Sequence, residues 1–599
     1  MINDKVVSLI LTSASSVMED EYSIYLGSWC FNGKYFQDDK NEINVLPFHW
    51  RNADELEAAI HYTEHLYEEM LPQLADFLNR YHGVDYSEDY WRIVTGKFFN
   101  YYINILYDRY VCLTKAFEQL PAISVKTMPD SLFVYSEKYT DFLMKSTSDD
   151  YYNYQLFSQL VRCLRYNDEP DRNMQILRNN RNESLKNRQS ISDYSIRSII
   201  KKPVLEARRK YYQSGITASI VLINTNIPKN KSIYLTLRSG MKIREVHPMK
   251  NEPVNDIKID TDARKKISNM TGPDEFGAIV WKTLQYNMPI CYLEGYKGQY
   301  KALLNKMKKG RRPKIIVVGY TPNDVMTLSW IAKCKEQGTK IVGVQHGGAY
   351  GEFKYDSREN FERKISHEYV TWGWKDTNDD VPLPALKLIN IKKKNVNCSN
   401  SILWVATESS KYCNIPWNTM YYPLQRDYLS RQKRFYKAVE DKFKNLFILR
   451  LKNVKANQMN RYWMEEYPEL KLDDNTIGFT DRLLACRLII FDHFGGTTFL
   501  EALTLNKPVI AFSQSQYTLL RDSARPYYNK LYETGILHDE PEDAARYLNL
   551  VIDDVDGWWN EPRRGEAVRM FRDNFAYVTQ DGIDRWKEFL LNKLRIDRE

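Results

Sequence analysis

The sequence has few features that would place the protein outside the cell. It has 599 residues but only eight cysteines, and no two of these are spaced as CxxC. No cluster of cysteine and histidine has the spacing of a zinc site, and a chain this long can bury a large core without disulfide bonds. We therefore predict reduced thiols and a cytoplasmic location.

Long apolar runs are also missing. No stretch reaches the roughly 18 apolar residues of a membrane-spanning helix, and the nearest, residues 98–111, contains Asn100, Asn104, Asp108 and Arg109. The N-terminal stretch lacks the basic region, apolar core and cleavage site of a signal peptide. These absences predict a soluble protein that contacts the cytoplasmic face of the inner membrane at most peripherally.

Several catalytic motifs are absent as well. There is no GxSxG, no GxxxxGK[ST] and no HExxH. The acid pairs Asp379-Asp380 and Asp473-Asp474 lie in polar stretches and do not form a DxD metal motif. We therefore expect no essential metal and no cofactor. The formal net charge of +8 is a mild bias that favours a phosphate-bearing ligand or an anionic membrane face, and we expect no nucleic-acid partner.

The N-terminal part is predicted to contain short strands followed by long helices. The expected strands are Val6–Leu11 and Ile24–Leu26, and the expected helices are Asp54–Arg80 and one from Ser87 towards Leu120. Pro72 should kink or split the first helix, and Gly83 should end it. Residues 140–200 are polar and are expected to form exposed helices and loops, as an insertion.

From about residue 313, short strands alternate with helices, which predicts βαβ units and parallel sheets. The expected strands are Lys314–Val318, Lys340–Gln345, Ser401–Ala406, Asn445–Leu451, Leu488–Phe491 and Pro508–Phe512, and the expected helices are Asn323–Gln337, 419–443, 479–485, 498–505 and 515–532. A basic joint near residues 391–395 separates two α/β domains, 1–395 and 396–599, and the last helix is a candidate to return to the first domain.

The most informative stretch is LIIFDHFGGTTFLEALTLNKPVIAF at 488–512. Its candidate donor-binding residues are Asp492, His493, Gly495, Gly496, Thr497, Thr498 and Glu501. The glycine pair allows a tight turn, either threonine should cap the next helix, and the free N–H groups of that helix should bind a phosphate. Glu501 could accept hydrogen bonds from a ribose diol. Alternatively, the glycines form only a turn and Glu501 pairs with Thr498 in a capping box.

A second glycine-rich turn, VQHGGAYG at 344–351, follows another expected strand. His346 is a candidate acid or base, or a donor to a ligand phosphate, and the alternative is a structural histidine bonded to the backbone. Gly347, Gly348 and Tyr350 form the loop around it and are expected to line a cleft.

Other candidates have a weaker pattern. Asp324, in GYTPND, is a candidate base, although an acid in the first turn of a helix is the more common explanation. Gly27 and Ser28 form an N-terminal turn that is expected to join the sheet edge where Asp324 and His346 are expected to lie. Arg450 and Lys452 follow a strand and could neutralise phosphates or be ordinary surface cations.

Together these motifs resemble a group of transferases from bacterial surface-polysaccharide gene clusters, first labelled from a Leptospira protein. The resemblance is carried by LGSWC at 26–30, LPFHWRN at 46–52, SEDYWRIVTGKFFNYYINILYDRY at 87–110, VQHGGAYG at 344–351 and GGTTFLEALTLNKPVIAF at 495–512. The chain departs from the group after Arg450-Leu451. There the group tends to have an aromatic residue, Pro and His, and this chain has Lys452-Asn453-Val454.

The resemblance implies an α/β fold of the GT-B type, in which two Rossmann-like domains face a central cleft, with extra helices in the N-terminal domain. It implies a glycosyltransferase that uses a nucleotide-sugar donor, with a CMP-linked keto-sugar acid such as Kdo as a candidate. The acceptor would be a lipid-linked glycan or oligosaccharide of O-antigen, lipopolysaccharide or capsule. By the resemblance, Glu501 holds the donor nucleotide, Gly495–Thr498 its phosphate, and His346 lies in the cleft.

Three other functions fit the same architecture. The first is a polyol-phosphate transferase of the teichoic-acid type, and the second is a sugar epimerase. The third is a non-catalytic protein that binds a glycan or scaffolds a membrane assembly.

Overall fold

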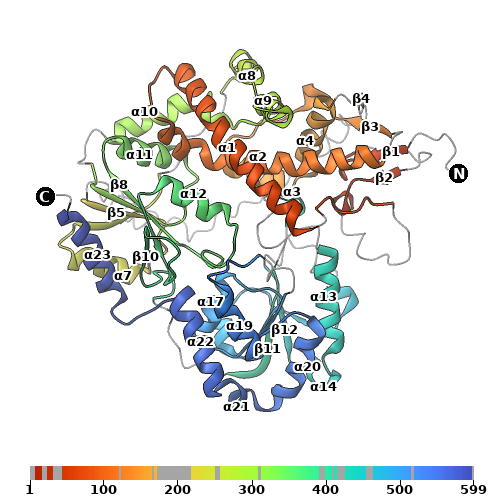
Figure 1. Cartoon of the computed structure of the whole chain (residues 1–599), viewed down its shortest axis with the longest axis vertical. Coiled ribbons are helices and arrows are strands. Elements are labelled where there is room, and N and C mark those ends of the chain that lie inside the picture. Colours follow the sequence, from red (N-terminus) through yellow and green to blue (C-terminus); the bar gives the residue numbers. More distant parts are fainter. Residues whose placement is uncertain are drawn as a thin grey trace, which may run out of the picture.

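The computed structural model describes most of the chain (Figure 1). The described residues are 7–15, 23–31, 44–50, 52–120, 123–164, 168–170, 218–249, 257–307, 312–389, 391, 398–407, 410–413, 425–452, 463–513 and 519–596. Within them the strands form three sheets, and every pairing between named strands is parallel. No helix in these ranges is long and apolar enough to cross a membrane.

The first sheet is small and lies beside two long helices. Its strands, in the order β2-β1-β3-β4, are β1 (Val7–Ile10), β2 (Ser23–Tyr25), β3 (Ile123–Thr127) and β4 (Asp168–Pro170). The helices of this region are α1 (Ala53–His82), α2 (Glu88–Gln119), α3 (Tyr139–Ser148) and α4 (Asp150–Cys163). Figure 1 shows α1 and α2 lying together across the top of the molecule.

The ends of these helices follow the sequence signals. Ser87 Oγ accepts a hydrogen bond from the Tyr90 N–H over 3.1 Å at the start of α2, and Gly83 ends α1 in the left-handed conformation with φ of 69°. The prediction that Pro72 splits the first helix is wrong, because α1 is continuous through it. Pro72 is exposed, so water can bond the carbonyl group that the proline leaves without a partner.

The prediction of an exposed polar region is wrong for residues 151–161. Helix α4 is buried along most of its length. Its polar side chains are matched to backbone groups: the Val134 N–H donates to Gln155 over 2.7 Å, and the Met128 N–H donates to Ser158 over 2.8 Å. Residues 165–200, apart from 168–170, lie outside the described residues.

The middle sheet has the strand order β10-β9-β8-β7-β5-β6. Its strands are β5 (Ile220–Ile223), β6 (Ile243–Val246), β7 (Ile315–Val318), β8 (Lys340–Val344), β9 (Glu368–Thr371) and β10 (Asp380–Pro382). Its helices are α7 (Lys229–Arg238), α8 (Thr261–Ser268), α9 (Glu275–Asn287), α10 (Tyr296–Met307), α11 (Val325–Glu336) and α12 (Ser357–Ile365). The chain winds outward in both directions from β5 and β7, so the sheet has a topological switch point between these two strands.

The third sheet has the order β13-β12-β11-β14-β15-β16, which is the Rossmann order 3-2-1-4-5-6. Its strands are β11 (Ser399–Val405), β12 (Phe447–Arg450), β13 (Lys471–Leu472), β14 (Cys486–Phe491), β15 (Val509–Phe512) and β16 (Leu537–His538). Its helices are α13 (Gln425–Ala438), α14 (Asp441–Lys444), α16 (Phe479–Ala485), α17 (Thr497–Thr504), α19 (Arg525–Glu533), α20 (Pro541–Val551), α21 (Val555–Trp559) and α22 (Pro562–Phe575).

Both large sheets are covered on two faces. One face of the middle sheet packs against the core that contains α1 and α2, and the other packs against α23 (Gly582–Ile596) through Trp586 and Leu590. The central strands of the middle sheet are accordingly apolar, as in β5 and β7, where all four residues are buried. Two doubly wound α/β units whose strand ends meet at one cavity form the GT-B arrangement, as the fold class inferred from the sequence requires.

Candidate active site between the two large sheets

A cavity of about 450 Å³ lies between the middle and third sheets. It is lined by Asn224, Asn226, Tyr320, His346, Gly347, Gly348, Ala349, Arg358, Lys387, Gly495, Gly496 and Thr497. Most of these residues follow the carboxyl ends of β5, β7, β8 and β14, which lie at or next to the switch points of the two sheets. This is where open α/β sheets bind ligands, and the volume is in the range of small-molecule sites.

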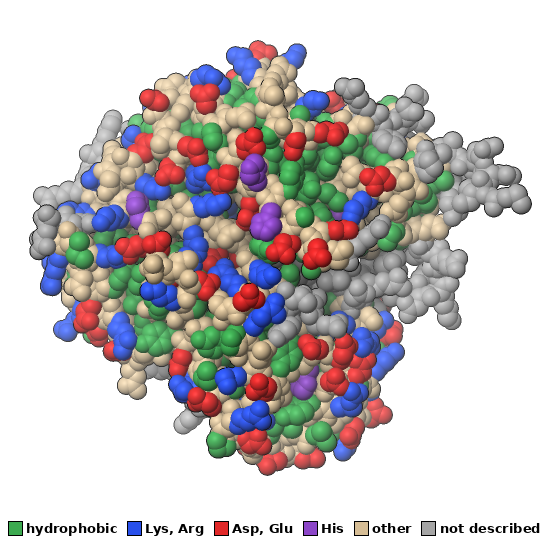
Figure 2. Space-filling view, in the orientation of Figure 1, with side chains coloured by type: hydrophobic (Ala, Val, Ile, Leu, Met, Phe, Trp, Pro, Cys, Tyr) green, Lys and Arg blue, Asp and Glu red, His purple; other side chains and the backbone are tan. Residues whose placement is uncertain are grey.

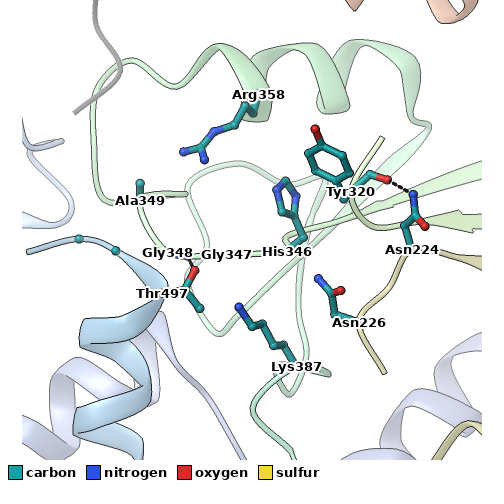
Figure 3. A pocket seen from close by; sticks show the side chains of 12 residues that line it. Asn224, Asn226, Tyr320, His346, Gly347, Gly348, Ala349, Arg358, Lys387 and Thr497 are labelled. Atoms are coloured by element: carbon teal, nitrogen blue, oxygen red, sulfur yellow. Dashed lines mark hydrogen bonds between the residues drawn. The ribbon is translucent and has the colours of Figure 1, made fainter. Parts of the chain in front are cut away.

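The two glycine-rich turns predicted from the sequence touch each other in this cavity. The Gly348 N–H donates a hydrogen bond to Thr497 Oγ1 over 3.0 Å (Figure 3). A Cβ atom on Gly348 would lie 2.6 Å from the Gly495 carbonyl oxygen, so only glycine allows this approach. Gly495 is left-handed with φ of 76°, and a Cβ there would meet the Phe353 ring at 2.4 Å.

The N-terminus of α17 opens into the same cavity. Gly496, not a threonine, is its N-cap residue, and no side chain caps the helix. The predicted threonine cap is therefore wrong, because the Thr497 hydroxyl accepts the hydrogen bond from Gly348 instead. Gly496 and Thr497 line the cavity, whereas Thr498 does not. The free N–H groups of the first turn of α17 are suited to a phosphate group.

His346 is held by an acidic and aromatic frame. Its Nδ1 lies 3.3 Å from Oε1 of Glu362, a buried residue of α12, and 3.0 Å from the Tyr350 hydroxyl. The Tyr369 hydroxyl donates to the same carboxylate over 3.1 Å. The Tyr320 ring meets the imidazole edge-on, with ring centroids 5.0 Å apart. A carboxylate on one ring nitrogen favours a proton there and leaves the other nitrogen as the acceptor.

Tyr320 is itself next to a buried cation. The Lys97 ammonium group, on α2, lies 4.2 Å from the Tyr320 ring centroid and donates to Asn323 over 2.9 Å. Burial acts to raise the pKa of Tyr320, but the Lys97 charge and the hydrogen bonds from Asn323 and Lys97 outweigh it and lower the pKa below its usual value. Helix α2 thus places a charge next to Tyr320, which lines the cavity.

Two further cations reach the cavity from opposite sides, with His346 and the glycine contact between them (Figure 3). Arg358 forms an ion pair with Asp356. Lys387 lies 3.6 Å from Glu501 Oε1. Burial raises the pKa of Glu501, and the Lys387 charge opposes that rise. Glu501 therefore stands behind Lys387 and does not itself line the cavity.

Asp492 and His493 form a buried network behind the glycine turn. Asp492 accepts hydrogen bonds from Trp404 Nε1 over 3.0 Å and Gln432 Nε2 over 2.6 Å, and its other oxygen lies 3.0 Å from His493 Nδ1. Both residues are nearly inaccessible and neither lines the cavity. The structure places them as supports of the turn at Gly495.

The remaining predicted site residues do not line the cavity. Arg450 donates to the buried Asp473 over 2.8 Å, and neither Arg450 nor Lys452 lines the cavity. Asp324 is the N-cap residue of α11 and does not line the cavity. Gly27 and Ser28 follow β2 of the first sheet, at the start of a short 3-10 helix whose Trp29 bonds the Leu11 carbonyl group, and they do not line the cavity.

Sequence reasoning missed several residues at the cavity. Asn224 and Asn226 follow the apolar run Ile220–Ile223, and both are left-handed, with φ of 51° and 57°. A buried strand followed by asparagines was a usable signal, because asparagine tolerates this conformation. Glu362 and Lys387 carried no such signal, since only the fold brings them close to His346 and Glu501.

Comparison with solved structures finds only remote likenesses. The wall teichoic acid polymerase TagF, in a variant soaked with CDPG, matches at 12% identity, covering 67% of this chain and 96% of that chain with a TM-score of 0.34. UDP-GlcNAc 2-epimerase from Neisseria meningitidis matches at 10% identity, covering 59% of this chain and 97% of that chain with a TM-score of 0.32. These structural likenesses are remote and assign no chemistry. No curated protein matches the sequence.

The decisive comparison is with protein families. The family model described as LIC12162 family transferase matches residues 7–590, which include both glycine-rich turns and all the strands of the three sheets. This chain therefore belongs to the LIC12162 family of transferases.

Proposed function

We propose that the protein transfers a sugar from a nucleotide-activated donor to a glycan acceptor, with the reaction taking place in the cavity between the two large sheets. The observation that carries this proposal is the convergence of a helix N-terminus, two cations and a carboxylate-paired histidine in one cavity. These are the groups needed to hold a phosphate and to remove a proton from an acceptor hydroxyl.

In the proposed reaction, His346 is the base. Glu362 holds the imidazole through Nδ1, so Nε2 accepts the proton of the acceptor hydroxyl. The acceptor oxygen then forms a bond to the anomeric carbon of the donor sugar, and the bond from that carbon to the phosphate oxygen breaks. The leaving phosphate keeps the electron pair and is stabilised by the N–H groups of α17 and by Lys387.

The identity of the donor rests on the sequence resemblance. A CMP-linked keto-sugar acid such as Kdo would bring two anionic groups, a phosphate and a carboxylate, and Arg358 and Lys387 lie on opposite sides of the cavity. We propose that the acceptor is a lipid-linked glycan or oligosaccharide of O-antigen or capsule, at the cytoplasmic face of the inner membrane. We propose that the reaction needs no metal, and turnover should then survive excess EDTA.

A panel of nucleotides tests donor binding first. UDP, GDP, CMP, CDP and dTDP would each be added to the purified chain, and thermal unfolding would be followed. A true donor nucleotide at about 100 times its Kd should stabilise the protein by about 2.7 kcal/mol. No response to any of them would count against the proposal.

Product analysis then separates the related functions. A new glycosidic bond on an oligosaccharide acceptor supports sugar transfer, whereas a phosphodiester product indicates polyol-phosphate transfer. A nucleotide sugar that changes without an acceptor indicates epimerisation. Intact glycan synthesis in cells carrying folded His346→Ala protein would indicate a non-catalytic role.

A further inference from the structure

Strongly exposed apolar side chains gather on one helix of the middle domain. Ten large apolar side chains are strongly exposed in the part of the chain that the structure describes, and four of them lie in residues 229–242. These four are Ile233, Tyr234, Leu237 and Met241, with exposed fractions of 45%, 39%, 67% and 47%. The segment consists of α7 and the turn that follows it. Isolated exposed apolar residues are ordinary, but such a concentration on one helix marks a contact surface.

The fold fixes the direction in which these four apolar side chains point. The opposite side of α7 carries Ser232, Leu235 and Thr236, which are buried. Leu235 belongs to the core that α23 shares with the middle sheet, and Figure 1 shows α7 and α23 together at the left edge of the molecule. The helix therefore cannot turn to bury Ile233 and Leu237 without emptying that core.

The charges around these four apolar side chains are mainly positive. Lys229, Lys231, Arg238 and Lys242 lie in the segment, and no Asp or Glu occurs between Thr225 and Arg244. Asp584, an acid on α23, accepts a hydrogen bond from the Tyr234 hydroxyl over 3.4 Å and pairs with Lys587 over 2.8 Å. On the face drawn in Figure 2, basic and acidic side chains are mixed.

This combination selects one kind of partner. Apolar side chains flanked mainly by cations suit the surface of an anionic phospholipid bilayer, where the apolar groups enter the headgroup region and the cations meet lipid phosphates. A second copy of this chain is disfavoured, because a symmetric contact would place the four cations of one copy against the same four of the other.

We infer that this surface, made of Ile233, Leu237 and Met241 with Lys229, Arg238 and Lys242 and here called the α7 surface, docks the protein on an anionic membrane. Asn226 lines the cavity only three residues before Lys229, so docking would hold the cavity next to the bilayer. A role of this docking in presenting a lipid-linked acceptor to the cavity rests on the proposed function. The docking itself does not, so each can fail separately.

Vesicle co-sedimentation of the full chain tests the docking. One set of vesicles is phosphatidylcholine alone, and the other contains about one third phosphatidylglycerol. The protein should bind the anionic vesicles, and added salt should weaken that binding. Each cation removed from the surface should cost about fivefold in partitioning, so Lys229→Gln with Lys242→Gln should weaken it more than tenfold.

The apolar part is tested with Ile233→Ser and Leu237→Ser together, which should also lower partitioning at least tenfold. Leu550→Ser is the matched control, because Leu550 is 79% exposed on α20 of the third-sheet domain, and it should bind like the wild type. Nucleotide-induced shifts in the unfolding temperature measure ligand binding in the cavity, which is independent of membrane docking. These shifts should be the same in all these variants. Equal binding to neutral and anionic vesicles would overturn the inference. Unchanged vesicle binding of the Ile233→Ser, Leu237→Ser variant would also overturn it. So would a wild-type protein that forms dimers in solution while this variant is monomeric.

Discussion

The backbone N–H of Gly348 donates a 3.0 Å hydrogen bond to the hydroxyl of Thr497, across 149 positions of sequence and between two separate sheets. Each residue belongs to the turn that follows a strand near the switch point of its own sheet. The Gly348 backbone also lies against the backbone of Gly495 and Gly496, so the two domains meet closely at the cavity. Any side chain placed between them would change the distance from the α17 N-terminus to His346.

The first prediction concerns this contact. Gly348→Ala would put a methyl group 2.6 Å from the Gly495 carbonyl oxygen, so the domains must separate by a few tenths of an ångström or more. We expect a loss of about 1–3 kcal/mol in the free energy of unfolding and a large loss of turnover. Gly565→Ala is the control: that helical glycine has nothing within 4 Å, and alanine there should stabilise the protein by about 0.5–1 kcal/mol. Equal effects of the two substitutions would show that the glycine contact is unimportant.

The second prediction concerns the histidine and its carboxylate. His346→Gln should lower kcat by about 10²–10⁴ with little change in donor affinity, because it removes the proton acceptor. Glu362→Gln should lower kcat by about 10–100-fold, since it only positions the ring. His65→Gln is the control, because that side chain is 80% exposed on α1 and should leave kcat unchanged. Wild-type turnover in the Glu362→Gln protein would mean that the pair is structural.

Much of this site could be predicted from the sequence. The apolar runs and the Gly-Gly pairs that follow them identify both turns at the carboxyl ends of β8 and β14, because strand, turn and helix signals are local. Partners far apart in the sequence could not be predicted. Nothing near Arg450 indicates that it pairs with Asp473, and nothing near Glu501 indicates Lys387. The same limit explains α4, whose polar side chains are buried because distant backbone groups bond them.

The third prediction separates a cavity cation from a structural one. Lys387→Met should weaken donor binding by about 10–100-fold, the effect of losing one charge-assisted hydrogen bond to a phosphate. Arg450→Met should leave donor affinity unchanged and lower stability by about 1–3 kcal/mol, because the buried Asp473 loses one arginine partner and keeps its bonds to Arg482 over 3.0 Å and to the Asn475 N–H over 3.1 Å. Calorimetric titration and thermal unfolding measure the two effects. Weaker donor binding in Arg450→Met with unchanged stability would restore the donor role that the sequence suggested.

The last prediction uses a buried acid where the two domains meet. Glu352 accepts hydrogen bonds from the Ala349 N–H over 2.7 Å and from the hydroxyl of Tyr528 on α19. Burial raises the pKa of Glu352 from 4.5 to about 8, although these two bonds act to lower it. Below pH 4.5 the group is protonated in both the folded and unfolded states, and above pH 8 it is ionised in both.

Between these limits only the unfolded chain releases the proton, so the free energy of unfolding should fall as pH rises, by at most about 1.4 kcal/mol per pH unit. Glu352→Gln keeps an oxygen for the Ala349 N–H and cannot ionise, so it should remove this fall. Urea unfolding at about pH 5 and about pH 8 measures it: relative to the wild type, the Gln variant should gain stability with pH. Glu566→Gln, on an exposed carboxylate, controls for the loss of a charge. A constant difference between wild type and Glu352→Gln at both pH values would show that Glu352 already ionises in the folded protein at the lower pH.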